Sequence, residues 1–197
     1  MTKPETSPAE AAAIAHVAEA ERAVWTIRDV PADMPARPLR TAAIIGAGTM
    51  GGGIAMAFVN AGIPVTLIDI DNAALERGLD RVRQNYESSV SKGRLERSAM
   101  DARMALLHPA TDLAAIAEVD IVIEAVFEQL DVKLDMFAKL DRLAKPGAVL
   151  ATNTSMLDVN RIAAVTGRPE DVIGLHFFSP ANVMRLLEVV QIGRAHV

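Results

Sequence analysis

A glycine-rich turn constrains the fold of this chain more than any other feature. The run Gly46-Ala47-Gly48-Thr49-Met50-Gly51 follows an apolar segment, Thr41–Ile45, and opens a helical pattern. In such a strand–turn–helix unit the first glycine permits the tight turn, the second lets the backbone approach a pyrophosphate, and the third lets helix and strand pack closely. The helix N-terminus adds free N–H groups and a positive dipole. The pattern predicts a dinucleotide site that uses Gly46, Gly48, Thr49, Met50 and Gly51.

An acidic residue, Asp69, ends the next apolar segment, Pro64–Ile68. A carboxylate at the end of the second strand accepts hydrogen bonds from the adenosine ribose hydroxyls and repels a 2′-phosphate. Asp69 therefore favours NAD over NADP as the cofactor. The alternative is that Asp69 only caps the following helix, a role that Asp71 can fill equally well.

Short apolar segments alternate with longer amphipathic ones along the rest of the chain. The predicted strands are Thr41–Ile45, Pro64–Ile68, Asp120–Val126, Ala148–Thr152, Val172–Phe177 and Leu186–Val190. The predicted helices are Met50–Ala61, Asn72–Val90, a segment with Leu130, Leu134, Phe137 and Leu140 that stops at Lys145-Pro146-Gly147, and a short helix before Val172. Strands alternating with helices indicate an α/β protein with a Rossmann-type, doubly wound, mainly parallel sheet.

Two further segments flank this domain. Residues 9–25 have an Ala-rich helical pattern, and a stretch punctuated by Pro31, Pro35 and Pro38 follows, which is typical of a linker because proline lacks the N–H that continues a helix or sheet. We therefore predict an N-terminal helix and linker over 1–38 and a nucleotide-binding domain over 39–191. Residues 192–197 match one reading frame of a common sequencing adapter, so we expect this tail to carry no function.

Composition narrows the class of protein. No apolar run in the 197 residues reaches the roughly 18 residues that span a bilayer, and the N-terminus has no apolar signal core. The absence of cysteine excludes disulfides, thiolate zinc sites and a cysteine nucleophile, and we expect no metal site. A net charge of −5 argues against a nucleic-acid partner. We expect a cytoplasmic protein.

A histidine and a glutamate mark the late strands. His176 lies at the end of the strand predicted over Val172–Phe177, and Glu188 lies between apolar neighbours on the next predicted strand. Ligands of open α/β sheets bind beyond the carboxyl ends of strands, and histidine titrates near neutral pH. A carboxylate among apolar neighbours needs a partner, and a His–Glu pair would also fix the imidazole tautomer. The Ser155 hydroxyl, in Asn153-Thr154-Ser155 at the same edge, is placed to bind a substrate oxygen.

Each of these residues also has a purely structural interpretation. A histidine beside two phenylalanines is often a core or interface residue, and a single glutamate is often a surface charge. The Asn-Thr-Ser sequence is common in loops and caps helices. The spacing of His176, Glu188 and Ser155 alone leaves both interpretations open.

Four segments together resemble the 3-hydroxyacyl-CoA dehydrogenases of fatty-acid β-oxidation. They are GAGTMGGGIA (46–55), VIEAVFEQLDVK (122–133), NTS (153–155) and GLHFFSPANVMRLLEVV (174–190). The resemblance covers roughly residues 40–190 and is to the NAD-binding domain, most of all in the multifunctional enzymes that also carry an enoyl-CoA hydratase. It implies an oxidoreductase that uses NAD to convert (S)-3-hydroxyacyl-CoA to 3-oxoacyl-CoA.

The resemblance also implies roles for single residues. His176 matches the catalytic base, Glu188 its carboxylate partner, and Ser155 the serine at the substrate's 3-oxygen. Asp69 matches the ribose-binding acid. Glu128 and Lys133 match contacts to the nicotinamide half of the cofactor or the substrate, and Asn153 is a further candidate cofactor contact. Lys92 falls near a lysine that meets the CoA phosphates, with Arg94 and Arg97 beside it; the alternative for this patch is a solvated charged face.

The chain departs from the family at both ends. Family members follow this domain with an all-helical domain that dimerises, covers the acyl-CoA cleft and supplies an active-site asparagine, and nothing here matches it. Residues 1–38 resemble the connection after a hydratase domain. We therefore expect NAD binding with poor turnover. The alternatives are a β-hydroxyacid dehydrogenase of the 6-phosphogluconate type, which uses a catalytic lysine, and a non-catalytic NAD-binding protein.

Overall fold

A computed structural model of the chain describes residues 6–27, 30–31 and 33–192. The chain divides into two compact units between Arg37 and Pro38. The first unit holds helix α1 (Pro8–Ala23), which begins where the Ser7 side chain accepts a hydrogen bond from Glu10 N at 3.2 Å. None of the residues of α1 is buried, so the helix brings no apolar core of its own.

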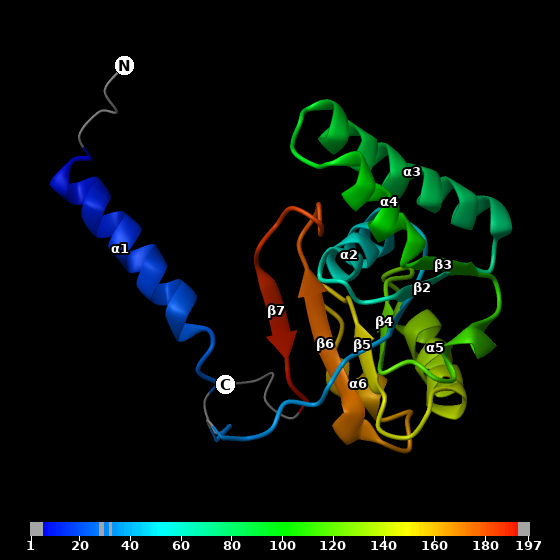
Figure 1. The fold of residues 1–197 in the computed structure, drawn as a ribbon. Helices are drawn as coiled ribbons and strands as arrows, with labels where there is room; N and C mark the ends of the chain where they lie inside the picture. Colours follow the sequence, from blue (N-terminus) through cyan, green and yellow to red (C-terminus); the bar gives the residue numbers. More distant parts are fainter. Residues whose placement is uncertain (1–5, 28–29, 32, 193–197) are drawn as a thin grey trace. The chain divides into compact units, whose positions relative to one another are not determined.

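The second unit is built on one seven-stranded sheet with the strand order β3-β2-β1-β4-β5-β6-β7 (Figure 1). The strands are β1 (Ala42–Ile45), β2 (Val65–Ile68), β3 (Leu107–Ala110), β4 (Ile121–Glu124), β5 (Val149–Thr152), β6 (Val172–Phe177) and β7 (Leu187–Val190). All neighbours pair in parallel except β6 and β7, which are antiparallel. The α/β class and the doubly wound, mainly parallel sheet are therefore confirmed.

Helices cover both faces of the sheet (Figure 1). One apolar cluster packs against α2 (Thr49–Asn60), α3 (Asn72–Ser91) and α4 (Arg97–Ala105). The other packs against η1 (Leu113–Ile116), α5 (Leu130–Leu143) and α6 (Val159–Ala163), and η2 (Pro169–Asp171) precedes β6. Strand β1 serves both clusters, because Ala42 and Ile44 face one and Ala43 and Ile45 the other. This explains why its sequence is continuously apolar, as expected of a strand buried on both faces.

Besides the short turn η2, three elements were not expected from the sequence. Strand β3 contains Pro109, which pairs with Leu67 of β2. Proline cannot donate to a ladder and is tolerated only where one side of the strand is unpaired, and β3 is the edge strand of the sheet. Helix α4 has a single buried residue, Met100, so it lacks the apolar stripe from which a helix is usually predicted. The 3-10 helix η1 is a short turn capped by Asp112.

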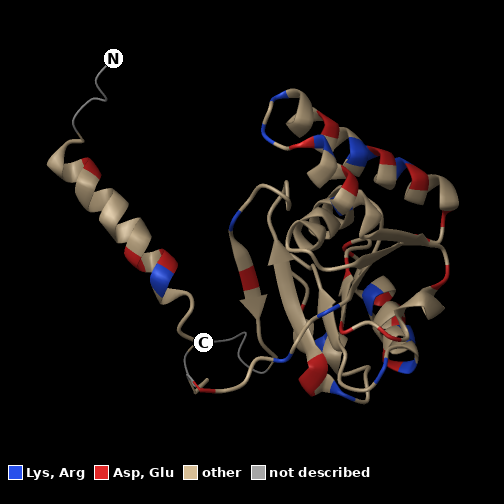
Figure 2. Ribbon diagram, viewed as in Figure 1, with Lys and Arg blue, Asp and Glu red and all other residues tan. Residues whose placement is uncertain are grey.

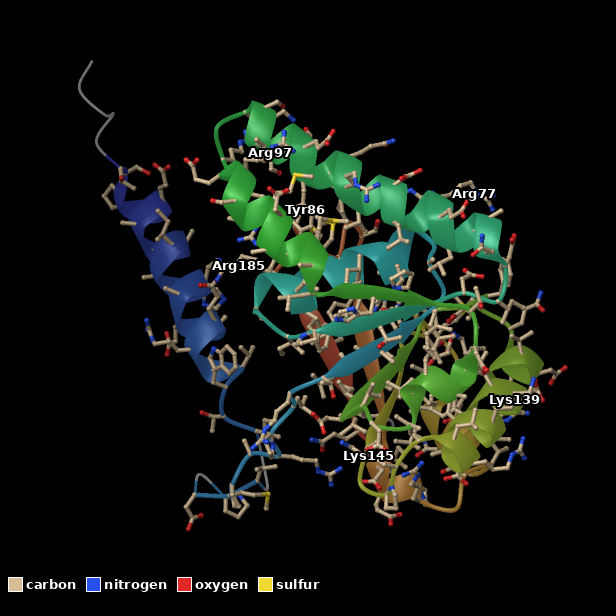
Figure 3. The ribbon with its side chains drawn as sticks, turned by 45° about the vertical axis from the view of Figure 1, so that its right-hand side comes forward. Arg77, Tyr86, Arg97, Lys139, Lys145 and Arg185 are labelled. Carbon is tan, nitrogen blue, oxygen red and sulfur yellow. The ribbon has the colours of Figure 1, made fainter. Side chains whose placement is uncertain are left out.

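A buried tyrosine joins the helices of the first face. The hydroxyl of Tyr86, which is labelled on α3 in Figure 3, donates to Asn60 Oδ1 at the end of α2, at 2.9 Å. The Arg103 guanidinium of α4 lies 5.8 Å from the ring centre. Burial raises the pKa of Tyr86 to about 12, against the opposing effect of Arg103. The contact holds α2, which begins within the glycine turn, against α3 and α4.

Candidate nucleotide-binding and catalytic site

The order of the strands creates a crevice at one edge of the sheet. Strands β2 and β3 follow one another on one side of β1, and β4 then lies on the other side of β1. Such a switch point separates the loops that follow the two central strands, and ligands bind there. Gly46 follows β1, Asp69 follows β2 and Asn153 follows β5 at this carboxyl edge. The antiparallel β7 begins at the same edge, which explains how Glu188 reaches it.

The glycine turn has the geometry that a pyrophosphate requires. Gly46 has a φ of 98°, and a Cβ atom there would lie 2.8 Å from Ala125 O. A Cβ atom on Gly51 would lie 1.8 Å from Gly46 O, so helix α2 can approach the turn only with glycine at this position. A Cβ atom on Gly48 would meet nothing within 4 Å, and no side chain caps the N-terminus of α2 there. The open face and the uncapped N–H groups fit a bound phosphate group.

The two residues that start α2 differ in what they can offer. Thr49 is exposed, whereas the Met50 side chain packs against the apolar core. Met50 can therefore face a phosphate through its backbone only. Sequence reasoning missed Gly78 of α3: a Cβ atom there would lie 2.4 Å from Ala47 O, so α3 packs directly on the turn. The unusual glycine inside a helical pattern was the available signal.

Asp69 is attached to the glycine turn. Its Oδ2 accepts from Ala47 N at 3.0 Å and its Oδ1 from Asp71 N at 3.2 Å. The cap of α3 is Asp71, whose Oδ1 accepts from Ala73 N at 2.9 Å. Asp69 is thus not the helix cap, and its carboxylate lies where the second strand meets the turn.

A buried ion pair lies beneath the crevice. Lys133 Nζ lies 2.7 Å from Glu124 Oε1 and 2.9 Å from Oε2, and both side chains are fully buried. Glu124 also accepts from Val126 N at 2.8 Å and Thr152 Oγ1 at 2.7 Å. The Lys133 ammonium is therefore enclosed beneath the surface of the crevice. Glu124 was not predicted, although a glutamate that ends a wholly apolar strand was a visible signal.

Glu128 joins this pair to the loop that carries Ser155. Its Oε1 accepts from Thr154 Oγ1 and, at 2.8 Å, from Ser155 N, while Oε2 lies 3.5 Å from Lys133 Nζ. Burial alone would raise the pKa of Glu128, but the hydrogen bonds from the loop and the charge of Lys133 outweigh it and lower the pKa. Glu128 is thus an ionised anchor of the loop, and the Ser155 side chain is exposed above it.

His176 and Glu188 are in direct contact. They are a cross-strand pair of β6 and β7, and His176 Nδ1 lies 2.7 Å from Glu188 Oε2. Because an ionised carboxylate can only accept, this contact in a neutral imidazole places the hydrogen on Nδ1 and leaves Nε2 as the proton acceptor. The Phe178 ring packs on the imidazole with ring centres 4.6 Å apart. Asn153 lies close by, because its Oδ1 accepts from Phe177 N at 2.9 Å.

The candidate CoA patch lies away from these contacts. Lys92 caps the C-terminus of α3, Arg94 lies in the turn to α4, and Arg97 is the first residue of α4, a region where Figure 2 shows basic residues. Arg97 lies 3.8 Å from Glu87, and all three basic side chains are exposed. No hydrogen bond or ion pair within the described residues joins Lys92 to His176, Glu188 or the glycine turn.

Comparison with known proteins gives one consistent picture. Residues 41–195 match the family model described as 3-hydroxyacyl-CoA dehydrogenase, NAD binding domain. The chain is 44% identical over 159 residues to the peroxisomal bifunctional enzyme of Cavia porcellus, covering 79% of this chain and 21% of that protein. It is 44% identical over 152 residues to 3-hydroxyadipyl-CoA dehydrogenase of Escherichia coli, covering 77% of this chain and 32% of that one. The chain therefore spans about a fifth to a third of these relatives.

Solved structures agree. The fold matches the crystal structure of 3-hydroxybutyryl-CoA dehydrogenase from Escherichia coli with a TM-score of 0.76 and 43% identity, over 78% of this chain and 32% of that one. It matches the dehydrogenase part of multifunctional enzyme 1 from C. elegans with a TM-score of 0.73 and 33% identity, over 84% of this chain and 38% of that one.

Proposed function

Because the chain belongs to the 3-hydroxyacyl-CoA dehydrogenase family through its NAD-binding domain, we propose that it serves the oxidation of (S)-3-hydroxyacyl-CoA to 3-oxoacyl-CoA. The observation that carries this proposal is the contact of 2.7 Å between His176 Nδ1 and Glu188 Oε2 at the carboxyl edge of the sheet. A protein that only binds NAD has no need of a histidine with an oriented, unprotonated Nε2 at this edge.

The cofactor is held by the turn and the acid beside it. The backbone at Gly48, Thr49 and Met50 faces the pyrophosphate, and Asp69 accepts from the ribose hydroxyls and excludes a 2′-phosphate. When bound, NAD supplies the acceptor for the hydride that leaves C3 of the substrate. Glu128 and Lys133 support the nicotinamide end from below, through the loop that Glu128 binds.

His176 and Ser155 act on the oxygen at C3. His176 Nε2 removes the proton of the 3-hydroxyl, and Glu188 stabilises the imidazolium that forms because its carboxylate already accepts from Nδ1. The Ser155 hydroxyl donates to the same oxygen, from a loop whose backbone is held by Glu128. Lys92, Arg94 and Arg97 offer positive charge to the CoA phosphates.

Two measurements on one pair of variants test the proposal. In His176→Gln we expect NADH oxidation by acetoacetyl-CoA to fall ~100- to 10,000-fold while the Kd for NADH stays within about twofold. The matched control is His108→Gln on the exposed edge strand β3, which should change neither. Full turnover in His176→Gln would contradict the role of His176 as the base.

The chain spans about a fifth to a third of its relatives, so the whole reaction is proposed for a longer protein. We propose that the 1–38 segment is a connection and that a following helical domain closes the cleft and dimerises, so the chain alone should bind NADH and turn over slowly. Turnover should rise when the chain is joined to the C-terminal part of the E. coli relative. Equal rates before and after joining would contradict this. Of the tail over 192–197, which is proposed to be without function, residues 193–197 lie outside the described residues.

The compartment is also a proposal. Relatives include a peroxisomal enzyme and one from Escherichia coli, and we propose a cytoplasmic location by analogy with the latter. Among the described residues, no helix has the length and apolar character needed to cross a membrane. Fractionation of cells that express the full-length protein, with a peroxisomal marker where the cell has one, checks the assignment.

A further inference from the structure

Strand β6 extends beyond the strand that supports it. Its pairing with β5 ends at Thr152↔Gly174, whereas its pairing with β7 continues to Phe177↔Leu187 (Figure 1). Along Leu175, His176 and Phe177 the backbone of β6 therefore has a neighbouring strand on one side only. That neighbour is β7, an edge strand whose residues are largely exposed. An edge of this kind frays more readily than the centre of a sheet.

The side chain of Asn153 binds β6 beyond the point where its pairing with β5 ends. Asn153 follows β5 directly, and its own backbone N donates to Glu124 O of β4 at 2.8 Å. Its Oδ1 accepts from Phe177 N at 2.9 Å. The carboxamide thus adds a further rung between the end of β5 and β6, at the position where the main-chain ladder has stopped.

This rung acts on the histidine. The Phe177 N–H belongs to the peptide between His176 and Phe177, so the bond orients the peptide plane from which the imidazole projects. The imidazole in turn reaches the exposed Glu188 of β7 at 2.7 Å from a partly buried position at the end of β6. A rotation of that peptide would move Nδ1 away from the carboxylate, since hydrogen bonds weaken steeply with misalignment.

We propose that Asn153 is a positioning residue for His176, and that it holds the histidine in the single tautomer with hydrogen on Nδ1. The proposal rests on the proposed role of His176 as the base. It assigns Oδ1 to the protein itself and leaves the Nδ2 donor, which has no partner among the described residues, for a ligand. The two halves of the carboxamide can therefore be tested separately: aspartate keeps the acceptor and lacks the donor, and alanine lacks both.

The tautomer is measured directly by NMR on the full chain, with ¹⁵N-labelled histidine and without cofactor. The four histidines are told apart with His176→Gln. In the wild type and in Asn153→Asp we expect one neutral His176 form with hydrogen on Nδ1. In Asn153→Ala we expect a mixture of both neutral forms, and exchange of the Phe177 amide with solvent at least about tenfold faster.

The matched control is Asn60→Ala, which removes one partly buried side-chain hydrogen bond, to Tyr86, from the other side of the domain. It should lower stability by a similar amount and leave the His176 tautomer and the Phe177 amide unchanged. An Asn153→Ala protein that is destabilised like this control but keeps the single tautomer overturns the proposal. If Asn153→Ala does not fold, the proposal is overturned by a tautomer mixture in folded Asn153→Asp. Because neither readout involves turnover, failure here is distinct from failure of the proposed reaction.

Discussion

Lys133 and Glu124 form an ion pair of 2.7 Å in which both side chains are fully shielded from solvent. The carboxylate is saturated, because Val126 N and Thr152 Oγ1 also donate to it. Lys133 reaches on to Glu128, which in turn binds the loop with Ser155. A chain of charges therefore runs from the core of the sheet to the surface of the crevice.

Breaking this pair from one side should be costly. Lys133→Met leaves a buried carboxylate without its counter-charge, and we expect a loss of about 3–5 kcal/mol in the free energy of unfolding. Adding Glu124→Gln to the same chain should recover part of that loss, since the buried charge is then gone. Urea denaturation measures both. The control is Lys139→Met, which removes an exposed pair with Asp135 and should cost about 0.5 kcal/mol or less.

Substitutions of two glycines in the turn should affect folding and NAD binding separately. Gly48→Ala places a Cβ atom in open space, so the free energy of unfolding should change by no more than about 0.5 kcal/mol. The Kd for NAD should nevertheless rise at least about tenfold, because the methyl group occupies the face that the pyrophosphate approaches. Gly51→Ala forces a Cβ atom to 1.8 Å from Gly46 O and should cost at least about 2 kcal/mol. Thermal melting and calorimetric titration check the pair; unchanged NAD affinity in Gly48→Ala contradicts the assigned face.

Asp69 should determine the choice of dinucleotide. In Asp69→Asn an acceptor for the ribose hydroxyls becomes an amide, and the repulsion of a 2′-phosphate is removed. We expect the Kd for NAD to rise about tenfold and the preference for NAD over NADP to shrink. Asp71→Asn is the control: it alters the cap of α3 and should leave the preference unchanged. The idea fails if Asp69→Asn discriminates between the dinucleotides as the wild type does.

Acid should lower the stability of the fold through Asp120, whose carboxylate binds the backbone just before β1. The hydrogen bond from Lys145 Nζ, at 2.7 Å (Lys145 is labelled in Figure 3), and those from Arg40 N and Thr41 N lower the pKa of Asp120 to about 2. Its ordinary value is 3.8, so the unfolded chain binds the proton first as pH falls. The ionised carboxylate stabilises the fold above that value, and the contribution disappears as pH falls towards 2.

We expect Asp120→Asn to be less stable than the wild type near neutral pH, with the difference in free energy of unfolding shrinking from about pH 5 to about pH 2. Lys145→Met should weaken the same pH dependence, because it removes the main cause of the pKa shift. Denaturation series at several pH values measure both. A difference that stays constant across this range would show that the pair does not act through ionisation.

Much of the sheet was predictable because parallel strands that are buried on both faces have continuously apolar sequences. Thr41–Ile45 and Pro64–Ile68 differ from β1 and β2 by no more than a residue at one end. The predicted Asp120–Val126 was too long, since β4 ends where Glu124 turns to bind Lys133. β3 was not predicted because a proline such as Pro109 normally argues against a strand, and it is tolerated here only because β3 lies at the edge of the sheet.

The sequence predicted which residues belong to the candidate site better than it predicted the contacts between them. The pairing of His176 with Glu188 followed from a carboxylate that needed a partner, and the structure brings the two together. The burial of Lys133 did not follow, because its partner Glu124 belongs to another element and no local pattern links them. The same holds for the rung from Asn153 to Phe177, which depends on where two ladders stop.

The antiparallel pairing of β6 and β7 has a consequence for how the histidine and its acid are specified. Both come from one hairpin, and they meet only because His176 lies opposite Glu188 in the ladder. A slip of one residue between the strands would send the carboxylate to the opposite face of the sheet. Errors of strand alignment would therefore leave His176 in place without its carboxylate partner, so the register of this one hairpin decides whether the proposed base is oriented.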